Sequence, residues 1–250
     1  MRAAILACIV LGLPAAAHAD LQVRSPLVEY RELEFEHNGF SGLDRKRSPF
    51  NGLQSYTYSV GYGLLPFWKI ELEAETGVVA GANQGYAATT LENIFQLTQE
   101  GRYFVDLGVF AEYSRSSLAG VPGSFTAGPI VQTELDDVAG IDSLHTLNLF
   151  LSRDVGRSHT DDSGLSYAAR SELLFRPLLD PGIEAFGSIG SITHAARYSD
   201  QQHSVGPVLT GAYLIAPYGK IKYEAGYQFG LTGRTARGGA RWKFEYEIAF

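Results

Sequence analysis

Ionisable residues recur at every second position in several stretches of this sequence. Along an extended strand, side chains two residues apart point to the same side. Each stretch would therefore present a row of charges on one face. Such rows can select permeating solutes by charge, or seal an interior by pairing with each other. The fullest rows are Glu32, Glu34 and Glu36, then Lys69, Glu71, Glu73 and Glu75, and finally Arg241, Lys243, Glu245 and Glu247.

Metal binding and catalysis are the other chemistries that these residue types allow. Oxygen-rich carboxylate sets suit Ca²⁺, but carboxylates spaced by two on a strand are more typical of a pore lining, and we predict neither a metal site nor a cofactor. A nucleophile–base pair on one strand face would need His and Ser two residues apart. Ser143 and His145 have this spacing in reverse order, and His145 shares its face with Leu147 and Leu149. We predict no catalytic residues and no enzyme.

Twelve segments carry the alternation of apolar and polar residues that is typical of strands. The loops after odd-numbered segments are long, and the turns after even-numbered ones are short. This rhythm predicts an all-β fold, a transmembrane antiparallel up-and-down β-barrel of twelve strands. Ten strands is the alternative, because the fourth and sixth segments alternate imperfectly. The expected strands are 27–37, 54–63, 67–77, 88–98, 102–114, 128–135, 141–153, 165–176, 183–193, 204–214, 220–230 and 240–250.

The first nineteen residues have the composition of a secretory signal peptide. A basic start at Arg2 precedes the apolar run Ala3–Leu13, and Ala17-His18-Ala19 offers a cleavage site. Residues 20–250 then form a single barrel domain. Cleavage after Ala19 removes the one cysteine and Arg2, leaving 19 basic against 27 acidic residues. This acidic balance argues against nucleic acid as a partner. The short segment before the first strand predicts that no N-terminal plug forms.

The closing stretch Ala240–Phe250 sets apolar residues against charged ones and ends on an aromatic. It resembles the C-terminal signature of bacterial outer-membrane β-barrel proteins. In that class, the terminal Phe and its alternating apolar partners are read by the barrel-assembly machinery. The resemblance implies a bacterial outer-membrane location, with membrane lipid, lipopolysaccharide and that machinery as partners. From Pro181 onward the chain is also similar to channel-like barrels, including outer-membrane proteins of phenol-degradation pathways. The implied assembly signal consists of Phe244, Tyr246, Ile248 and Phe250.

The polar face of a membrane barrel points inward. On this inward face we count 15 acidic and 6 basic residues, and Arg176 is one of the six basic residues. Such an excess favours a hydrated lumen, and we expect a narrow passive channel for small polar or cationic solutes. A closed ionic core in a structural or surface-interaction barrel is the alternative, and a lipid-active enzyme is a third. The predicted pore-lining residues are Glu32, Glu34, Glu36, Lys69, Glu71, Glu73, Glu75, Arg170, Glu172, Lys222, Glu224, Arg241, Lys243, Glu245 and Glu247.

Overall fold

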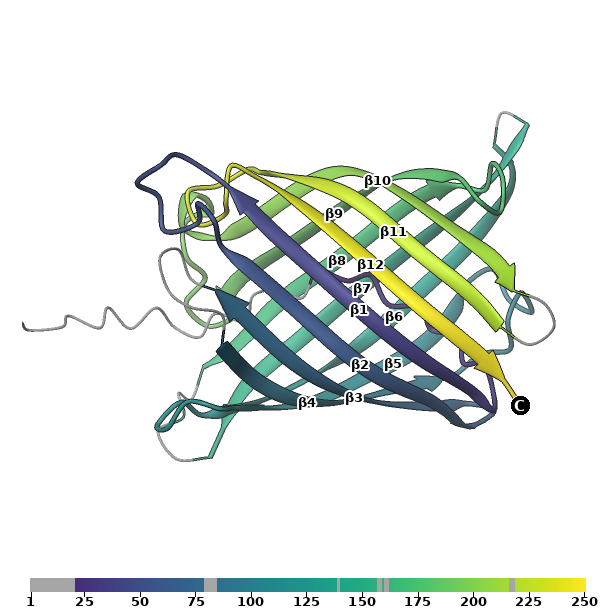
Figure 1. Cartoon of the computed structure of the whole chain (residues 1–250), viewed down its shortest axis with the longest axis horizontal. Helices are drawn as coiled ribbons and strands as arrows, with labels where there is room; N and C mark the ends of the chain where they lie inside the picture. Colours follow the sequence, from purple (N-terminus) through teal and green to yellow (C-terminus); the bar gives the residue numbers. More distant parts are fainter. Residues whose placement is uncertain (1–20, 79–84, 139, 157–158, 160–161, 216–218) are drawn as a thin grey trace, which may run out of the picture.

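The protein forms a closed barrel of twelve antiparallel strands (Figure 1). The computed structural model describes residues 21–78, 85–138, 140–156, 159, 162–215 and 219–250, so the predicted signal peptide lies outside the described residues. The strands are β1 Glu32–Leu43, β2 Gln54–Leu65, β3 Trp68–Val78, β4 Gly85–Gln96, β5 Asp106–Ser116, β6 Gly123–Val138, β7 Ile141–Val155, β8 Ser163–Leu173, β9 Asp180–Ser191, β10 Gln202–Ile215, β11 Gly219–Gly230 and β12 Gly238–Ala249. The predicted fold class and the count of twelve strands are confirmed.

The barrel closes where β12 pairs with β1. The ladder runs from Glu32 opposite Ala249 to Leu43 opposite Gly238. Every strand therefore has two hydrogen-bonded neighbours, and the sheet leaves no unpaired edge, as a strand structure in a bilayer requires. Among the described residues, no helix is long and apolar enough to cross a membrane.

Several strand boundaries differ from those that the sequence pattern predicts. β1 begins at Glu32 rather than at residue 27. The connection between β4 and β5 spans residues 97–105, so it is not the three-residue turn that we expected. Hydrogen bonds from backbone amides to side chains hold this connection in place. The Leu107 amide donates to Thr98 Oγ1 at 2.8 Å, and the Gly101 amide donates to the Asp106 carboxylate at 3.1 Å. Such local side-chain bonds compete with the strand ladder.

The weakest predicted segment is the longest strand. β6 has 16 residues, and Pro129 lies in its middle, opposite Val109, rather than near its start. On the β7 side, the ladder passes from Ala127 directly to Ile130. Proline has no amide hydrogen to donate, and a Cβ at Gly128 would lie 1.8 Å from the carbonyl oxygen of Leu149. This close approach of two backbones interrupts the alternation on which the prediction was based.

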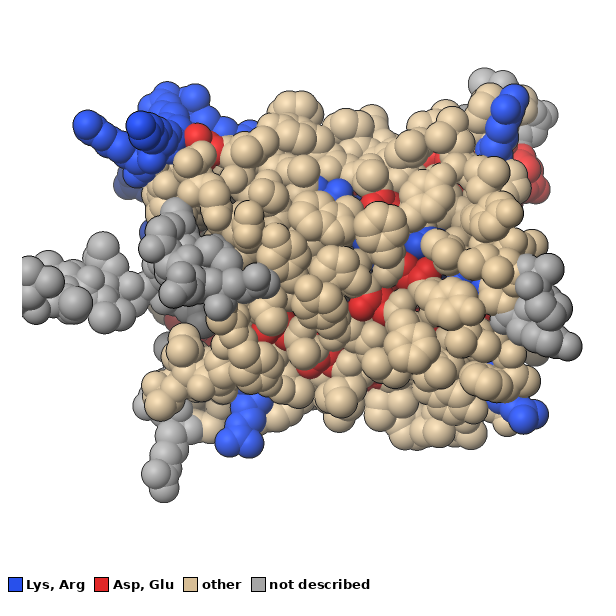
Figure 2. All heavy atoms as spheres, in the orientation of Figure 1, with Lys and Arg blue, Asp and Glu red and all other residues tan. Residues whose placement is uncertain are grey.

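The two faces of the wall have opposite chemistry. Large apolar side chains such as Phe35, Leu72, Leu149 and Phe244 are exposed on the outside. Figure 2 shows residues other than Lys, Arg, Asp and Glu over most of the visible face between the two ends, with charged atoms seen at depth between them. Acids, amides and hydroxyls of the opposite parity are buried inside. This arrangement is that of a barrel whose outer surface faces hydrocarbon.

One part of the interior is apolar, which the sequence pattern did not predict. Ile94, Phe110, Ile130 and Phe150 lie on β4, β5, β6 and β7 and form a buried cluster. The Phe110 and Phe150 ring centroids are 4.7 Å apart. Each of these residues shares its strand parity with inward polar residues, so the wall of β4 to β7 carries an apolar patch inside the barrel.

Candidate functional site in the barrel interior

The predicted ladder residues lie on the interior face, and most of them join ion pairs. On β3, Lys69 pairs with Glu34 of β1 and lies 3.2 Å from Glu71. The two strands are separated by β2, whose inward residue at this level is Gly61. A Cβ on Gly61 would lie 3.2 Å from Glu34 Oε2 and 3.4 Å from Glu71 Oε2. The small side chains of β2 therefore leave the space in which long charged side chains of β1 and β3 meet.

A second group joins β11, β12 and β1. Lys243 pairs with Glu36 and lies 2.9 Å from Glu245. Lys222 pairs with Glu247 and lies 3.3 Å from Glu245. Glu245 and Glu36 are directly opposite across the closing seam, where like charges repel. The two lysines compensate this repulsion, so ion pairs accompany the backbone ladder where the barrel closes.

A third group lies on β8, β9, β11 and β12. Arg241 pairs with Glu184 and lies 2.7 Å from Glu224. Arg170 contacts the same two carboxylates at 3.3 and 2.5 Å. Gly226 makes room, because a Cβ there would lie 3.1 Å from Glu184 Oε1. The Arg241 guanidinium thus reaches toward Glu184 of β9 and not toward the glutamates of the adjacent β1.

The remaining predicted residues are placed as follows. Glu172 accepts a hydrogen bond from Thr210 at 2.8 Å, and Glu75 accepts one from Thr90 at 2.7 Å. Glu32 and Glu73 are buried. Arg176 was counted inside but is exposed beyond the end of β8. All fifteen predicted residues thus have the inward parity, while their role as a pore lining stays a prediction.

Carboxylate oxygens of Glu32, Glu34 and Glu247 lie within 4.8 Å of one another, close enough to share a cation. Lysines already compensate this group, because Lys69 pairs with Glu34, and Lys220 lies 2.6 Å from Glu247. Such pairing offsets the repulsion that a metal ion would otherwise relieve. The absence of a metal site stays a prediction.

Residues 21–31, which we call the strap, run into the barrel: Gln22, Arg24 and Pro26 are buried inside it, whereas residues 29–31 are exposed next to the start of β1. The prediction that no N-terminal segment could plug it was wrong, because β1 begins five residues later than expected and leaves a longer segment free. In Figure 1 the purple coil before β1 passes behind β1 and β12. Asn148 of β7 clamps the strap backbone: its Oδ1 accepts from the Arg24 amide at 2.7 Å, and its Nδ2 donates to the Arg24 carbonyl at 2.9 Å.

Further side chains attach the strap to the wall along its length. Gln22 donates to Glu36 at 2.8 Å, and the Val28 amide donates to Gln96 at 2.8 Å. Val28 also packs against the apolar cluster of β4 to β7. Pro26 fills the space that Gly108 leaves, since a Cβ there would lie 2.9 Å from Pro26 Cβ. The strap therefore contacts both the apolar patch on β4 to β7, through Val28, and the ion-paired Glu36 of β1, through Gln22.

The middle of the barrel is consequently filled in this conformation. Asn148 and Ile130 are 0% exposed, and Thr90, Glu184 and Glu247 are 1% exposed. Side chains lining an open aqueous pore would be accessible to water. The sequence signal that could have revealed this packing is the set of large apolar residues at inward parity, namely Ile94, Phe110, Ile130, Phe150 and Phe186.

The serine and histidine that share a strand face do meet. Ser143 Oγ lies 3.0 Å from a ring nitrogen of His145. The serine is only 2% exposed, so a substrate would not reach its hydroxyl in this conformation. A hydroxyl–imidazole contact at a buried position is also an ordinary way to satisfy two polar groups. The contact by itself does not indicate catalysis.

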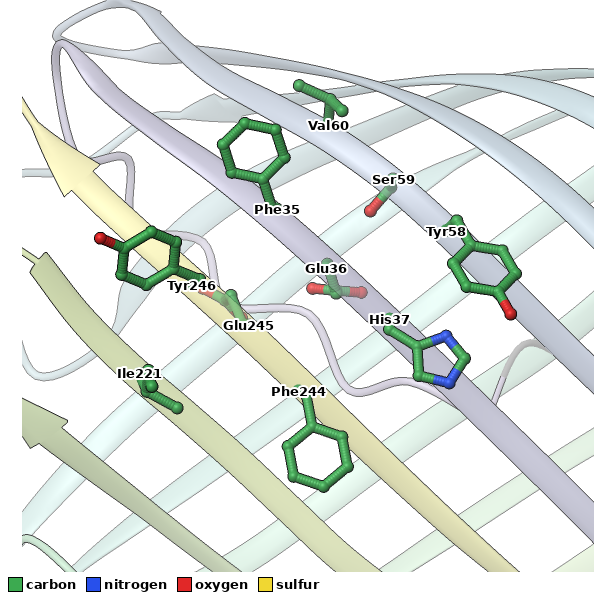
Figure 3. A pocket seen from close by; sticks show the side chains of 10 residues that line it. All are labelled: Phe35, Glu36, His37, Tyr58, Ser59, Val60, Ile221, Phe244, Glu245 and Tyr246. Atoms are coloured by element: carbon green, nitrogen blue, oxygen red, sulfur yellow. The ribbon is translucent and has the colours of Figure 1, made fainter.

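A shallow apolar groove of about 530 Å³ runs over the closing seam on the outside. Figure 3 shows outward Phe35, His37 and Phe244, while Glu36 and Glu245 point the other way. His37 stacks on Tyr58 with centroids 4.6 Å apart. The view displays the strict alternation on which the placement of the charged ladders rests.

No protein family description matches the chain, and no curated protein matches it. Solved structures do. The NanC porin matches with a TM-score of 0.52 and 13% identity, covering 87% of this chain and 100% of its own. The KdgM porin, in complex with disordered oligogalacturonate, matches with a TM-score of 0.49 and 9% identity, covering 88% of this chain and 99% of its own. The transport unit of the autotransporter AIDA-I from Escherichia coli matches with a TM-score of 0.46 and 12% identity, covering 88% of this chain and 90% of its own.

The chain has the barrel fold of the NanC porin. At this level of identity, the likeness to the NanC porin shows the fold and nothing finer. It agrees with the apolar outer belt and the polar interior that the strand pattern predicts.

Proposed function

We propose that this protein is an outer-membrane channel for small polar solutes that prefers cations. The observation that supports the proposal best is the charge of the interior. The interior acids are Glu32, Glu34, Glu36, Glu71, Glu73, Glu75, Glu92, Asp106, Glu112, Glu172, Glu184, Glu224, Glu245 and Glu247, and the bases are Arg24, Lys69, Arg170, Lys220, Lys222, Arg241 and Lys243. In this set the acids outnumber the bases by two to one.

An acidic interior favours the passage of cations and opposes that of anions. Carboxylate rings are a common basis of cation selectivity, whereas anion pores use Arg and Lys. The strap fills the middle of the lumen, so solutes pass only after it has moved. Export by a signal peptide cleaved after Ala19, and assembly by the barrel-assembly machinery, complete the proposal.

Planar-bilayer recordings test the channel, using the chain from Asp20 and a second chain that lacks residues 20–28. In a KCl gradient, we expect the reversal potential to have the sign of cation selectivity. Glu73→Gln removes one buried interior charge and should reduce that selectivity. Glu100→Gln, at an exposed position in the connection between β4 and β5, is the matched control and should change little.

A structural barrel without conductance is the second candidate, because the packed interior of this conformation also fits that role. The chain without residues 20–28 separates the two functions. If this chain folds and gives no current, the channel is wrong and the structural barrel is favoured. Anion selectivity in either chain would likewise contradict the proposal.

A further inference from the structure

Arg24 of the strap occupies a built cation site on the inner wall. Its Nε lies 3.0 Å from Glu92 Oε2, and its Nη2 bonds the other oxygen of the same carboxylate. The guanidinium carbon lies 4.5 Å from the Phe110 ring centroid and 6.0 Å from that of Phe150. The side chains of Arg24 and Glu92 are 6% and 4% exposed. A buried carboxylate beside aromatic faces is a favourable environment for a planar organic cation.

This wall has no inward base of its own. By sequence, β4 to β7 contain two basic residues, Arg115 and Arg153, and both are exposed on the outward side. Glu92 stands directly opposite Glu112 in the β4–β5 ladder. Glu92 is buried and Glu112 is half-buried, and two facing carboxylates repel each other unless a positive charge lies nearby. The strap supplies that charge from outside the sheet.

Residues 22–28 of the strap belong to no strand ladder of the barrel, whereas Arg31 is bonded through its backbone to Gly63 and Phe250. Residues 21–31 form neither a helix nor a strand, and the contacts that hold residues 22–28 run mainly through side chains of the wall. A departing Arg24 would take the guanidinium away from the Glu92 carboxylate on a wall that has no inward base of its own. Because an unpaired buried charge is costly, the strap leaves readily only if another cation takes its place.

We propose that Glu92, Phe110 and Phe150 form a binding site for solutes that carry a guanidinium or a similar planar cation on an apolar stem. Arg24 is the internal occupant of this site and closes the lumen until such a solute displaces it. The site thus assigns a solute class to the proposed channel, and only the conductance part of its test rests on that function.

The binding test uses calorimetry on the folded chain from Asp20 in detergent micelles. The probes are butylguanidinium and butylurea, which have the same shape and differ in charge. Arg24→Ala should bind butylguanidinium at least about tenfold more tightly than the unchanged chain, because the internal competitor is gone. Butylurea should not bind. Adding Glu92→Gln to Arg24→Ala should weaken binding by about tenfold or more.

Arg31→Ala is the matched control, since Arg31 belongs to the strap but is exposed. It should bind like the unchanged chain. Arg24→Gln, which keeps a long polar side chain, replaces Arg24→Ala if the latter does not fold. Equal affinity for butylguanidinium in the unchanged and Arg24-substituted chains, or an affinity that does not depend on Glu92, would overturn the site.

Bilayer recordings separate the site from the channel. Arg24→Ala should raise the open fraction, and butylguanidinium should open the unchanged chain. Absence of current in every variant, including the chain without residues 20–28, overturns the channel but leaves the calorimetric result to decide the site. Current that is the same in the unchanged, Arg24→Ala and Arg31→Ala chains contradicts the closing role of Arg24.

Discussion

At the scale of single residues, the surroundings of each interior charged side chain depend on its ion-pair and hydrogen-bond partners, which its position in a row of charges does not reveal. Glu184 shows this most clearly, because Arg241, Arg170 and Gln228 all donate to it and it is 1% exposed. Glu224 shares the two arginines. The small residue Gly226 is as necessary as the charges, since its missing side chain leaves room for them.

Glu184→Gln should destabilise the folded barrel. The substitution leaves two buried guanidinium groups to share Glu224, and breaking a buried pair costs about 3 kcal/mol. We expect a lower temperature for the loss of the compact, fast-migrating form in gel electrophoresis. Glu29→Gln, whose side chain is 61% exposed and 3.9 Å from Lys220, is the control and should leave the transition unchanged. Equal transition temperatures for Glu184→Gln and the unchanged chain would show that the ion pairs of Glu184 contribute little to the stability of the barrel.

At the scale of elements, β12 has two separate tasks. Its inward residues Lys243, Glu245 and Glu247 contribute ion pairs across the closing seam. Its outward residues contribute little to packing inside the protein: Phe244 is 54% exposed and Tyr246 is 39% exposed. Surface that is exposed in the folded protein remains available to lipid, or to a factor that acts during assembly.

Phe250→Ala tests the predicted assembly signal made of Phe244, Tyr246, Ile248 and Phe250. The Phe250 side chain is 69% exposed, while its amide donates to the Arg31 carbonyl at 3.2 Å. The substitution keeps that hydrogen bond, so the stability of barrel refolded in detergent should not change. In cells, we expect several-fold less folded barrel in the outer membrane. Phe229→Ala, on the outside of β11 and 52% exposed, should assemble normally.

At the scale of the whole molecule, the barrel is apolar on its outside and strongly polar inside. Proteins that fold in water bury their apolar face, and this chain does the reverse over most of its surface. An apolar outer surface is stable if hydrocarbon surrounds the barrel. The backbone also fits that environment, because every strand is paired on both sides. The exposed belt therefore carries the argument for a membrane location.

Leu149→Arg tests that location. Leu149 lies near the middle of β7 and is 40% exposed on the outer wall. An arginine at the bilayer midplane costs about 2–4 kcal/mol, so unfolding from lipid vesicles should need less denaturant. Leu118→Arg, in the loop before β6 and 65% exposed, should have little effect. Equal effects at both positions would argue against a surrounding bilayer.

The sequence by itself determined the properties that depend on neighbouring residues. Alternation has a period of two, and each strand shows it locally. Twelve strands, the closing role of β12 and the inward parity of the fifteen ladder residues could therefore be predicted. The prediction failed where the alternation is interrupted, as at Gly128 and Pro129, and where side chains extend a turn, as between β4 and β5.

Only the tertiary structure decided how the interior is filled. Arg24 and Asn148 are 124 residues apart in sequence, and no local pattern links them. The partners of Arg241 likewise depend on the arrangement of strands around the lumen, not on its neighbours along the chain. Local periodicity decides which way a side chain points, whereas packing across a closed barrel decides what it meets there.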